Sequence, residues 1–480
     1  MASVRPRRGF IDRDDNYTRL KSMLVRRLTA SAERYGFPFW ETPTIEALEA
    51  LLGGGESEAV KQIFYVRSPD DGQMDLGLRF DLTIPFARVA AGLIRGGHPL
   101  PLRRAETGLV YRADKPGIGR TRQFTQFDID ILGSPSPWAE LEILSMLYSA
   151  LGEHSTVLPP MPGLSIYTKV SSRRLLDAVL DAVGIDEQRL RLAVIRVIDK
   201  MEKLEPREVL LELTVGRKDE SGADIPGVGL PSVTADQVLE RIVNLRSHPS
   251  REDSLNAAAQ YVKSVQGEQA IQELAEFSDA LDLVGLSDRD VEFDFSLARG
   301  LDYYTGLVFE VRNRSDDRMS IAAGGRYDDL LSRFSDVSMS GTGISVGIDR
   351  LAELLLAEGA EVATASLPER KILLGLPGVQ PAALQVVANK IRSGGVDIQL
   401  HIPEPGTPLR KQLAYANRGD YAFALLVGPE ELRDGTVSVK NLRQDSRTEA
   451  ELSHEEYRAL GTKGQRTLSL DDAIGFLATR

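Results

Sequence analysis

The chain has 480 residues, of which 42% are hydrophobic, 27% charged and 6% aromatic. This composition is typical of a soluble globular protein, and the length predicts roughly two to four domains. With no cysteine and five scattered histidines, the sequence excludes disulfides, thiolate catalysis and Cys-based zinc sites, and it offers no metal-ligand spacing. The net charge of −12 argues against a general nucleic-acid coat.

Hydropathy and charge distribution restrict the location of the protein and the partners that it can bind. No apolar stretch reaches membrane-spanning length, and the first thirty residues lack a signal-peptide core, so we expect a cytoplasmic protein without a membrane partner. Residues 371–480 carry 14 Lys and Arg against 13 Asp and Glu. This near-neutral last part leaves room for a selective RNA contact.

The first 170 residues predict a mixed α+β pattern. Residues 16–34 have helical spacing, and an extended segment before Pro43 follows, an opening suited to a dimer interface. Residues 62–67, 74–80 and 126–132 have the composition of strands, and residues 83–95 that of a helix. Antiparallel pairing is favoured over regular βαβ alternation.

The rest of the chain predicts an interrupted core and a separate last domain. Helical segments fill residues 171–286, strands resume at 291, and residues 341–359 pass from a strand into an amphipathic helix. After a small polar linker, strands and helices alternate as in a parallel-sheet α/β domain. We therefore predict these parts: core 1–170, helical insertion 171–286, core 287–359, linker 360–370 and C-terminal domain 371–480.

Two stretches of the first part combine charge with strand periodicity. In LRFDLT, residues 78–83, Asp81 and Thr83 alternate with apolar residues, so we expect them on one sheet face, where they can bind an amine. In residues 111–130, we expect Arg112 and Asp114 to share one face of a first strand, before a PGIG loop. Gln126, Asp128 and Asp130 share one face of the return strand.

Three later stretches add arginine, tyrosine and glycine. The run LARGLDYYTGLVFE, residues 297–310, places Arg299, Tyr303 and Tyr304 in a turn before a predicted strand at 305–312, a pattern suited to a polar, anionic ligand. Paired glycines in AAGGRYDDLL, residues 322–331, permit a close approach of backbone. In GTGISVGIDRLAELLL, residues 341–356, Arg350 lies in the first turn of a helix, whose amides favour phosphate. Read singly, the first of these stretches is also compatible with an ordinary strand entry, and the last with a solvated helix start.

Taken in this order, the stretches resemble the histidyl-tRNA synthetase family of class II aminoacyl-tRNA synthetases. YRADKPGIGRTRQF and GISVGIDRL are similar to two class-wide motifs, and ARGLDYYTG and AAGGRYDDL are similar to motifs of the histidine enzymes. The last domain resembles the family's anticodon-binding module. The resemblance implies an antiparallel sheet core flanked by helices, a homodimer, and ATP, L-histidine and tRNA(His) as substrates.

The resemblance also implies roles for matching residues. Arg112 would grip the α-phosphate of ATP and the histidine carboxylate, and Arg350 the γ-phosphate. Asp114 would approach the adenine and Phe124 would stack on it. Arg299 would be the catalytic arginine at the α-phosphate.

For the amino acid, the resemblance implies two groups of residues. Asp81, Thr83 and Gln126 would hold the α-amino group, while Asp130 and Tyr304, with Tyr303 nearby, would read the imidazole. The substrate carboxylate attacks, so no protein nucleophile is needed, and Mg²⁺ carried by the phosphates would neutralise the departing pyrophosphate.

Some positions depart from the family pattern and leave alternatives open. Asp349 stands where the family usually has Glu, and the PGIG loop is short. Many bacterial members have Glu where this chain has Asp81, Asp114 and Asp130, a pattern similar to the eukaryote-like branch. One alternative is a histidine-sensing regulatory subunit of ATP phosphoribosyltransferase, which typically lacks the C-terminal module. Another is a paralogue that charges a different acceptor.

Overall fold

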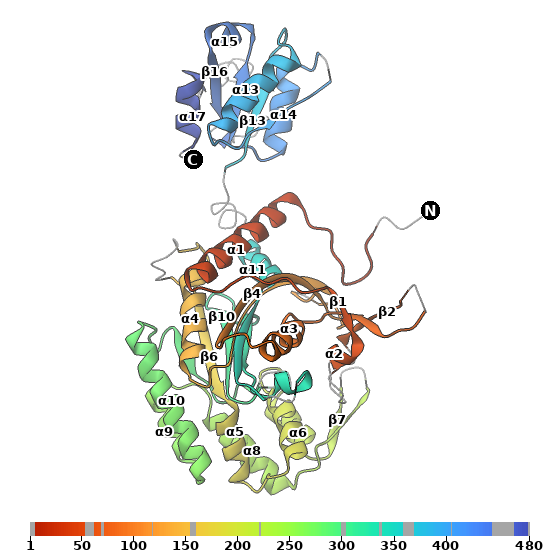
Figure 1. Ribbon diagram of the computed structural model, residues 1–480, viewed down its shortest axis with the longest axis vertical. Helices are drawn as coiled ribbons and strands as arrows, with labels where there is room; N and C mark the ends of the chain where they lie inside the picture. Colours follow the sequence, from red (N-terminus) through yellow and green to blue (C-terminus); the bar gives the residue numbers. More distant parts are fainter. Residues whose placement is uncertain are drawn as a thin grey trace. The chain divides into compact units, whose positions relative to one another are not determined.

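The computed structural model describes residues 5–52, 62–68, 72–117, 119–153, 160–219, 222–298, 304–335, 338–358, 369–404, 406–443 and 465–478. The chain divides into two compact units, residues 1–366 and 367–480 (Figure 1). The predicted division of the first unit into core and insertion, and the linker at 360–370, stay predictions.

A seven-stranded sheet forms the centre of the first unit, in the order β4-β5-β12-β11-β10-β6-β9. Neighbouring strands pair antiparallel except β6 and β9, which pair in parallel. The predicted antiparallel core is therefore confirmed. The strands are β4 (Leu102–Tyr111), β5 (Gln123–Leu132), β6 (Ile166–Ser172), β9 (Val291–Phe293), β10 (Leu307–Asn313), β11 (Ser320–Arg326) and β12 (Gly341–Gly347).

Helices α1 (Asp15–Arg34), α4 (Trp138–Leu151) and α11 (Ile348–Ala357) pack together against one face of this sheet (Figure 1). The Asp14 side chain caps α1 by accepting a hydrogen bond from Tyr17 N at 2.9 Å. Leu20, Leu24 and Leu28 follow at four-residue spacing and are fully buried. The helix predicted over residues 16–34 is thus confirmed.

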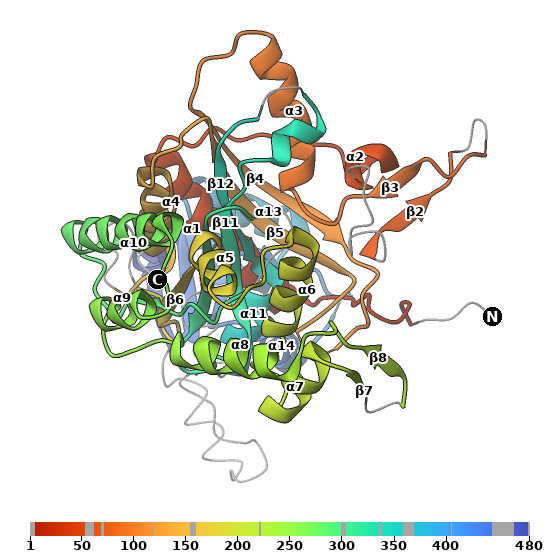
Figure 2. The same ribbon diagram turned by 90° about the horizontal axis from the view of Figure 1, so that it is seen from below.

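A small satellite sheet lies beside the main one, in the order β1-β3-β2 (Figure 2). Its strands are β1 (Ile45–Ala47), β2 (Phe64–Val66) and β3 (Leu76–Leu78), shorter than the strands predicted at 62–67 and 74–80. The short helix α2 (Leu48–Leu52), the predicted helix α3 (Thr83–Arg95) and the 3-10 turn η2 (Leu330–Arg333) complete this part.

The predicted helical region between residues 171 and 286 contains six helices among the residues the structure describes. Buried leucines at 175, 176 and 180 form the inner face of its first helix. A two-stranded hairpin, β7 (Gly216–Lys218) and β8 (Asp224–Pro226), interrupts the helices and was not predicted. The helices are α5 (Arg173–Asp181), α6 (Gln188–Ile198), α7 (Pro206–Leu213), α8 (Ser232–Asn244), α9 (Arg251–Ala259) and α10 (Val265–Leu283).

The second unit contains a five-stranded sheet in the order β14-β13-β15-β16-β17. Only its first three strands are parallel, so the prediction of a parallel sheet is corrected to a mixed one. The eight residues between β15 and β16 are too few for a parallel crossover, and Gly435 turns the chain back with φ +67°. The strands are β13 (Lys371–Gly375), β14 (Gln399–Leu400), β15 (Phe423–Val427), β16 (Thr436–Asn441) and β17 (Gln465–Ser469).

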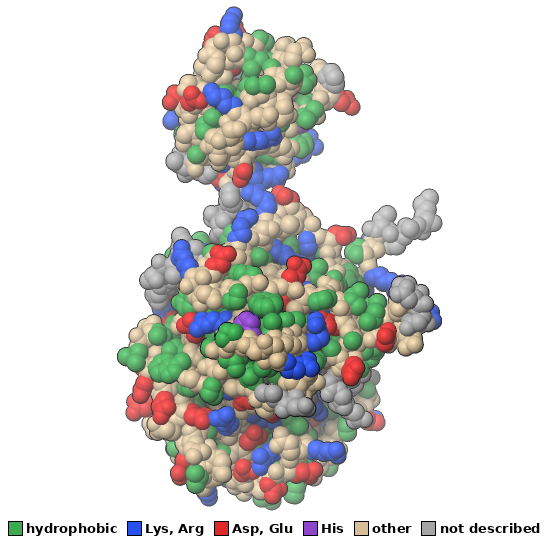
Figure 3. Space-filling view, in the orientation of Figure 1, with side chains coloured by type: hydrophobic (Ala, Val, Ile, Leu, Met, Phe, Trp, Pro, Cys, Tyr) green, Lys and Arg blue, Asp and Glu red, His purple; other side chains and the backbone are tan. Residues whose placement is uncertain are grey.

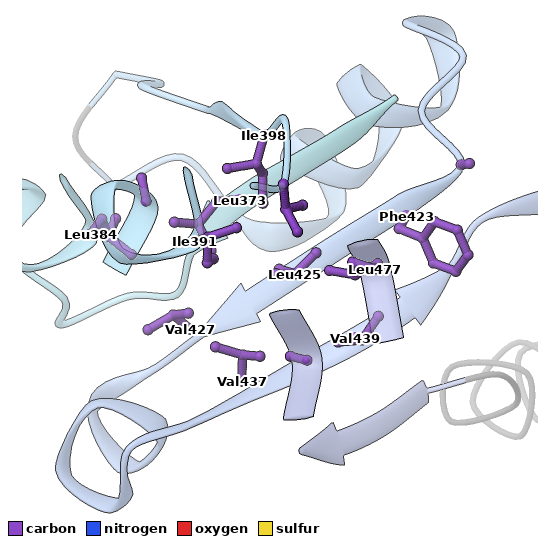
Figure 4. Close-up of a cluster of buried hydrophobic side chains, with 14 residues drawn as sticks. Leu373, Leu384, Ile391, Ile398, Phe423, Leu425, Val427, Val437, Val439 and Leu477 are labelled. Carbon is purple, nitrogen blue, oxygen red and sulfur yellow. The ribbon is translucent and has the colours of Figure 1, made fainter. Parts of the chain in front are cut away.

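Helices pack on this sheet over an apolar core. Leu373, Leu425 and Val439 of the sheet meet Ile391 and Leu477 of the helices, and all five are buried (Figure 4). All members of this core belong to residues 367–480, as expected for a domain with its own core. The helices are α13 (Pro381–Ser393), α14 (Leu409–Arg418), α15 (Pro429–Asp434) and α17 (Leu470–Ala478).

Candidate functional site

A cavity of about 560 Å³ lies over the seven-stranded sheet and reaches the first turns of α11. Helices α5 and α6 lie in front of the sheet on this side, and side chains of both line the cavity (Figure 2). The cavity brings together eight of the predicted site residues: Asp81, Thr83, Arg112, Asp114, Phe124, Gln126, Tyr304 and Arg350. Arg299 and Tyr303 lie outside the described residues.

Asp81 and Thr83 reach the cavity from the start of α3 and do not share a strand as predicted, because β3 ends at Leu78. Asp81 Oδ1 accepts a hydrogen bond from Ile84 N at 3.1 Å, an interaction that favours a helix start. Its Oδ2 is buried and has no hydrogen-bond partner among the described residues. Burial raises the pKa of Asp81 to about 6.

Arg112 and Asp114 lie beyond the end of β4 at Tyr111, so the prediction that they share a strand face was wrong. The turn between Gly117 and Arg120 closes with two backbone hydrogen bonds of 3.1 and 3.0 Å, and the chain leaves the ladder before it. Arg112 Nε donates to Phe80 O at 3.0 Å, and its guanidinium carbon lies 5.2 Å from the Phe124 ring centroid. A cation and an aromatic ring thus border the cavity side by side.

Arg350 lies in the first turn of α11, as predicted. Its Nε donates to Gly119 O at 3.2 Å and its Nη1 donates to Ser320 O at 3.1 Å. These carbonyls orient the guanidinium at the cavity, where it can meet an anionic ligand.

A row of buried polar side chains follows β5 beneath the cavity. Gln126, Asp128 and Asp130 alternate on one face of the strand, as predicted, and each is at least 94% buried. Asp130 lies behind the residues that line the cavity, where it accepts a hydrogen bond from Tyr327 Oη. A Cβ at its register partner Gly343 would lie 2.1 Å from Asp130 Oδ1, so glycine provides the space for this carboxylate.

Arg104 of β4 is a fully buried cation that the sequence analysis missed. Its Nη1 lies 2.7 Å from Glu106 Oε2 and its Nη2 lies 2.8 Å from Asp130 Oδ2. It also donates to Leu82 O at 2.9 Å. In the sequence, only the charged residues of RRAET at 103–107 hinted at a buried ion pair around Arg104. Tyr327 belongs to the AAGGRYDDLL motif, but the motif alone did not assign it a role.

Gln126, Asp128 and Asp130 form the floor beneath the cavity. At Asp128, fewer polar contacts offset the cost of burial than at Asp130. Ser345 Oγ donates a hydrogen bond to Asp128 Oδ1, while Asp128 Oδ2 has no partner in the described part of the chain. Burial raises the pKa of Asp128 to about 8; Arg104 lowers it, and the neighbouring Asp130 and Asp81 raise it. Burial also raises the pKa of Asp130. At neutral pH the floor therefore holds at least one protonated carboxyl group.

Asp349, the neighbour of Arg350 in α11, connects this helix to α1 and to β5. It is 8% exposed, and its Oδ1 accepts from Tyr17 Oη of α1 at 2.7 Å. Its Oδ2 accepts from Thr125 N of β5 at 2.6 Å, and Lys21 Nζ lies 3.3 Å away. Asp349 thus fixes the position of α11 against α1 and against the strand that carries Phe124.

Comparison with known proteins identifies the class. A family model described as Histidyl-tRNA synthetase matches residues 9–351, and one described as Anticodon binding domain matches residues 377–480. The antiparallel sheet, its cavity and the second unit together define an aminoacyl-tRNA synthetase.

Individual relatives agree with these models. The chain is 35% identical to the histidine–tRNA ligase of Paracoccus denitrificans over 92% of this chain and 90% of the relative, and 33% identical to that of Caulobacter vibrioides over 98% and 95%. The solved histidyl-tRNA synthetase from Nostoc sp. PCC 7120 has the same fold, with a TM-score of 0.74, 22% identity and full coverage of both chains. The chain belongs to the histidyl-tRNA synthetase family.

The described residues contain neither a candidate membrane-spanning helix nor a cluster of metal-binding side chains. No helix among them is both long enough and apolar enough to cross a bilayer. Within the same residues, no three His, Asp or Glu side chains are grouped so that they could hold a metal ion.

The Asp128→Asn variant should become more stable than the parent protein as the pH rises. Asp128 ionises near pH 4 in the unfolded chain and at about 8 in the fold, so the fold binds the extra proton between these values and the carboxyl destabilises it progressively from pH 4 to pH 8. We expect the Tm difference between the variant and the parent to grow in favour of the variant by about 2–4 °C from pH 5 to pH 8.5. Calorimetric scans at both values measure this difference.

Asp316→Asn is the matched control for this prediction. Asp316 is held ionised by Arg318, which lowers its pKa to about 2, so its replacement should shift Tm equally at both pH values. A Tm difference for Asp128→Asn that does not change with pH would contradict the assignment.

Tyr17→Phe should weaken ATP binding from outside the cavity. Loss of the Tyr17–Asp349 hydrogen bond releases the carboxylate that fixes Arg350 and Thr125, and a net loss of about 1 kcal/mol corresponds to roughly a 5-fold rise in KM for ATP. The KM for histidine should stay within about twofold. Both are measured by pyrophosphate exchange.

Tyr35→Phe supplies the comparison for Tyr17→Phe. Tyr35 caps the end of α1 and loses a similar hydrogen bond, to Ser145 O at 3.2 Å, which has no connection to Asp349. Equal KM values for ATP in the two variants would show that Asp349 does not carry the effect.

Proposed function

We propose that the chain activates L-histidine with ATP to histidyl-adenylate and then transfers the histidyl group to tRNA(His). The observation that carries this proposal is the pairing of opposite charges in one cavity. Asp81 lines the cavity and Asp130 lies behind its lining, and these buried acids suit the cationic groups of histidine. Arg112 and Arg350, which also line the cavity, suit the phosphates of ATP.

Two acceptor atoms support the placement of the α-amino group. Asp81 Oδ2 and Gln126 Oε1 are buried, and neither has a hydrogen-bond partner among the described residues. Both side chains line the cavity, as does Thr83. An ammonium group supplies the three donors that these oxygens lack, and its charge favours the ionised form of Asp81.

The imidazole is assigned to the other end of the acid row. Tyr304 lines the cavity, and Asp130 lies behind Tyr327, which also lines it. We assign recognition of the two ring nitrogens to Tyr304 and Asp130, with Tyr303 nearby. The roles of Tyr303 and Arg299 depend on the sequence resemblance alone.

The reaction needs positioning and charge stabilisation. An oxygen of the histidine carboxylate bonds to the α-phosphorus of ATP while the bond to the bridging oxygen breaks and pyrophosphate leaves. A terminal ribose hydroxyl of the tRNA then attacks the carbonyl carbon, and AMP leaves. We assign Arg112 and Arg299 to the α-phosphate, Arg350 to the γ-phosphate, and Phe124 and Asp114 to the adenine.

Three further features belong to this proposal. Magnesium would accompany the phosphates and neutralise part of their charge when bound. A homodimer would cover exposed apolar side chains near the start of the chain, such as Phe39 at 42% and Ile45 at 46% exposure. We also propose a cytoplasmic location, which a tRNA substrate supports.

The regulatory-subunit alternative has less support. The second unit matches an anticodon-binding model, and Arg112 and Arg350 both line the cavity. A histidine sensor requires neither feature. We therefore propose the ligase.

Purified protein should catalyse histidine-dependent exchange of pyrophosphate into ATP and should charge tRNA(His). Arg299→Ala should lower exchange by about 10²–10³-fold, because it removes a donor to the charge that develops on the α-phosphate. Arg318→Ala, at an arginine whose side chain is 84% exposed, serves as the control and should exchange normally. Absence of histidine-dependent exchange in the unmodified protein would overturn the proposed function.

A further inference from the structure

We propose that residues 5–10 extend the hairpin of residues 112–117 and 119–122 into a phosphate-binding rim for the single-stranded end of the tRNA, with Arg7 and Arg8 as the added contacts. This inference rests on the proposed function, because a tRNA end must reach the cavity to accept the histidyl group. It assigns a role to the first residues of the chain.

The backbone of this segment is held against the hairpin. Arg122 N donates to Gly9 O at 2.7 Å, and Phe10 N donates to Arg7 O at 2.9 Å, which closes a turn around Arg8. The Phe10 ring lies 6.1 Å from the Phe64 ring of β2. The arginines are therefore presented from a fixed turn.

Gly9 shows how closely the two segments pack. Its φ of +90° lies in the region that only glycine adopts readily. A Cβ at this position would lie 2.8 Å from Arg122 Cγ and Cδ and from Pro116 Cγ. Any other residue would push the segment away from the hairpin.

The rim concentrates positive charge on a chain whose net charge is −12. Residues 5–10 contain three cations and residues 112–122 contain four, against one acid, Asp114. By contrast, basic and acidic side chains are interspersed over the face of the first unit drawn in Figure 3. A local excess of this kind attracts a polyanion.

The charges of the rim are available for binding. Arg7, Arg8, Lys115 and Arg120 are exposed, and none forms an ion pair with an acid in the described part of the chain. Arginines that only interact with solvent would be equally exposed. They would not require the hydrogen bond of Gly9 to the hairpin or the packing of Phe10 on Phe64.

The rim lies at the cavity. Arg120 and Asp114 of the hairpin line it, and the hairpin joins the residues 5–10 through Arg122. An RNA strand that delivers its terminal ribose to the cavity carries its phosphates across this edge. Arginines suit phosphate through paired N–H donors. The competing ligand of the same chemistry is ATP itself.

The double variant Arg7→Ala/Arg8→Ala separates these two ligands. With the full-length protein and tRNA(His), we expect kcat/KM for charging to fall about 10-fold at 50 mM KCl. The slope of log kcat/KM against log salt should become shallower by about 1.4, the value for two phosphates on single-stranded RNA. Histidine-dependent pyrophosphate exchange should stay within about twofold.

Two further variants test charge and geometry separately. Arg7→Lys/Arg8→Lys keeps both charges and should keep most of the charging activity and the salt slope. Gly9→Ala keeps all charges but displaces the segment from the hairpin, so charging should again fall more than exchange.

Two outcomes would contradict the proposal that Arg7 and Arg8 bind the tRNA. Charging by the double alanine variant within twofold of the parent at both 50 and 200 mM KCl would exclude RNA contact by Arg7 and Arg8. An equal loss of charging and exchange would assign them to ATP. Failure of exchange in the unmodified protein would instead refute the proposed function, so the two failures are distinguishable.

Discussion

The site depends on the ion pairs and the hydrogen bond that the fully buried guanidinium of Arg104 forms. This guanidinium joins Glu106 on its own strand to Asp130 on β5 and holds Leu82 O at the start of α3. Removal of one member of a buried ion pair typically costs about 3–5 kcal/mol, because a charge is left without a partner. Arg104 therefore fixes three elements and sets the charge of the cavity floor.

The two kinds of charge around the cavity are held differently. Burial raises the pKa values of Asp81 and Asp128. Because the acids here outnumber the fully buried Arg104, this part of the cavity attracts a cationic substrate group. By contrast, backbone carbonyls position Arg112 and Arg350. Both guanidinium groups line the cavity, where their geometry suits phosphates. One cavity can therefore bind an amino acid and a nucleotide whose charges are opposite.

Sequence patterns predicted those features that depend on neighbours in the chain. The alternation of Gln126, Asp128 and Asp130 and the place of Arg350 follow from strand and helix periodicity. Asp81 was misplaced because its carboxylate caps a helix where an apolar alternation indicated a strand. Arg104 was not singled out, and Asp349 was noted only as a departure from the family pattern, because an Arg in a strand or an Asp at a helix start usually faces water. Only pairing with distant elements, such as α1 and Asp349, buries them.

Calorimetry of histidine binding tests most directly the claim that the floor awaits a cation. Binding enthalpies measured at pH 7 in buffers of different ionisation enthalpy give the number of protons released. Because the arriving ammonium lowers the pKa values of the buried acids, the parent should release more protons than Asp128→Asn, while the titration of histidine itself is common to both. Equal proton release by the two proteins would contradict this account.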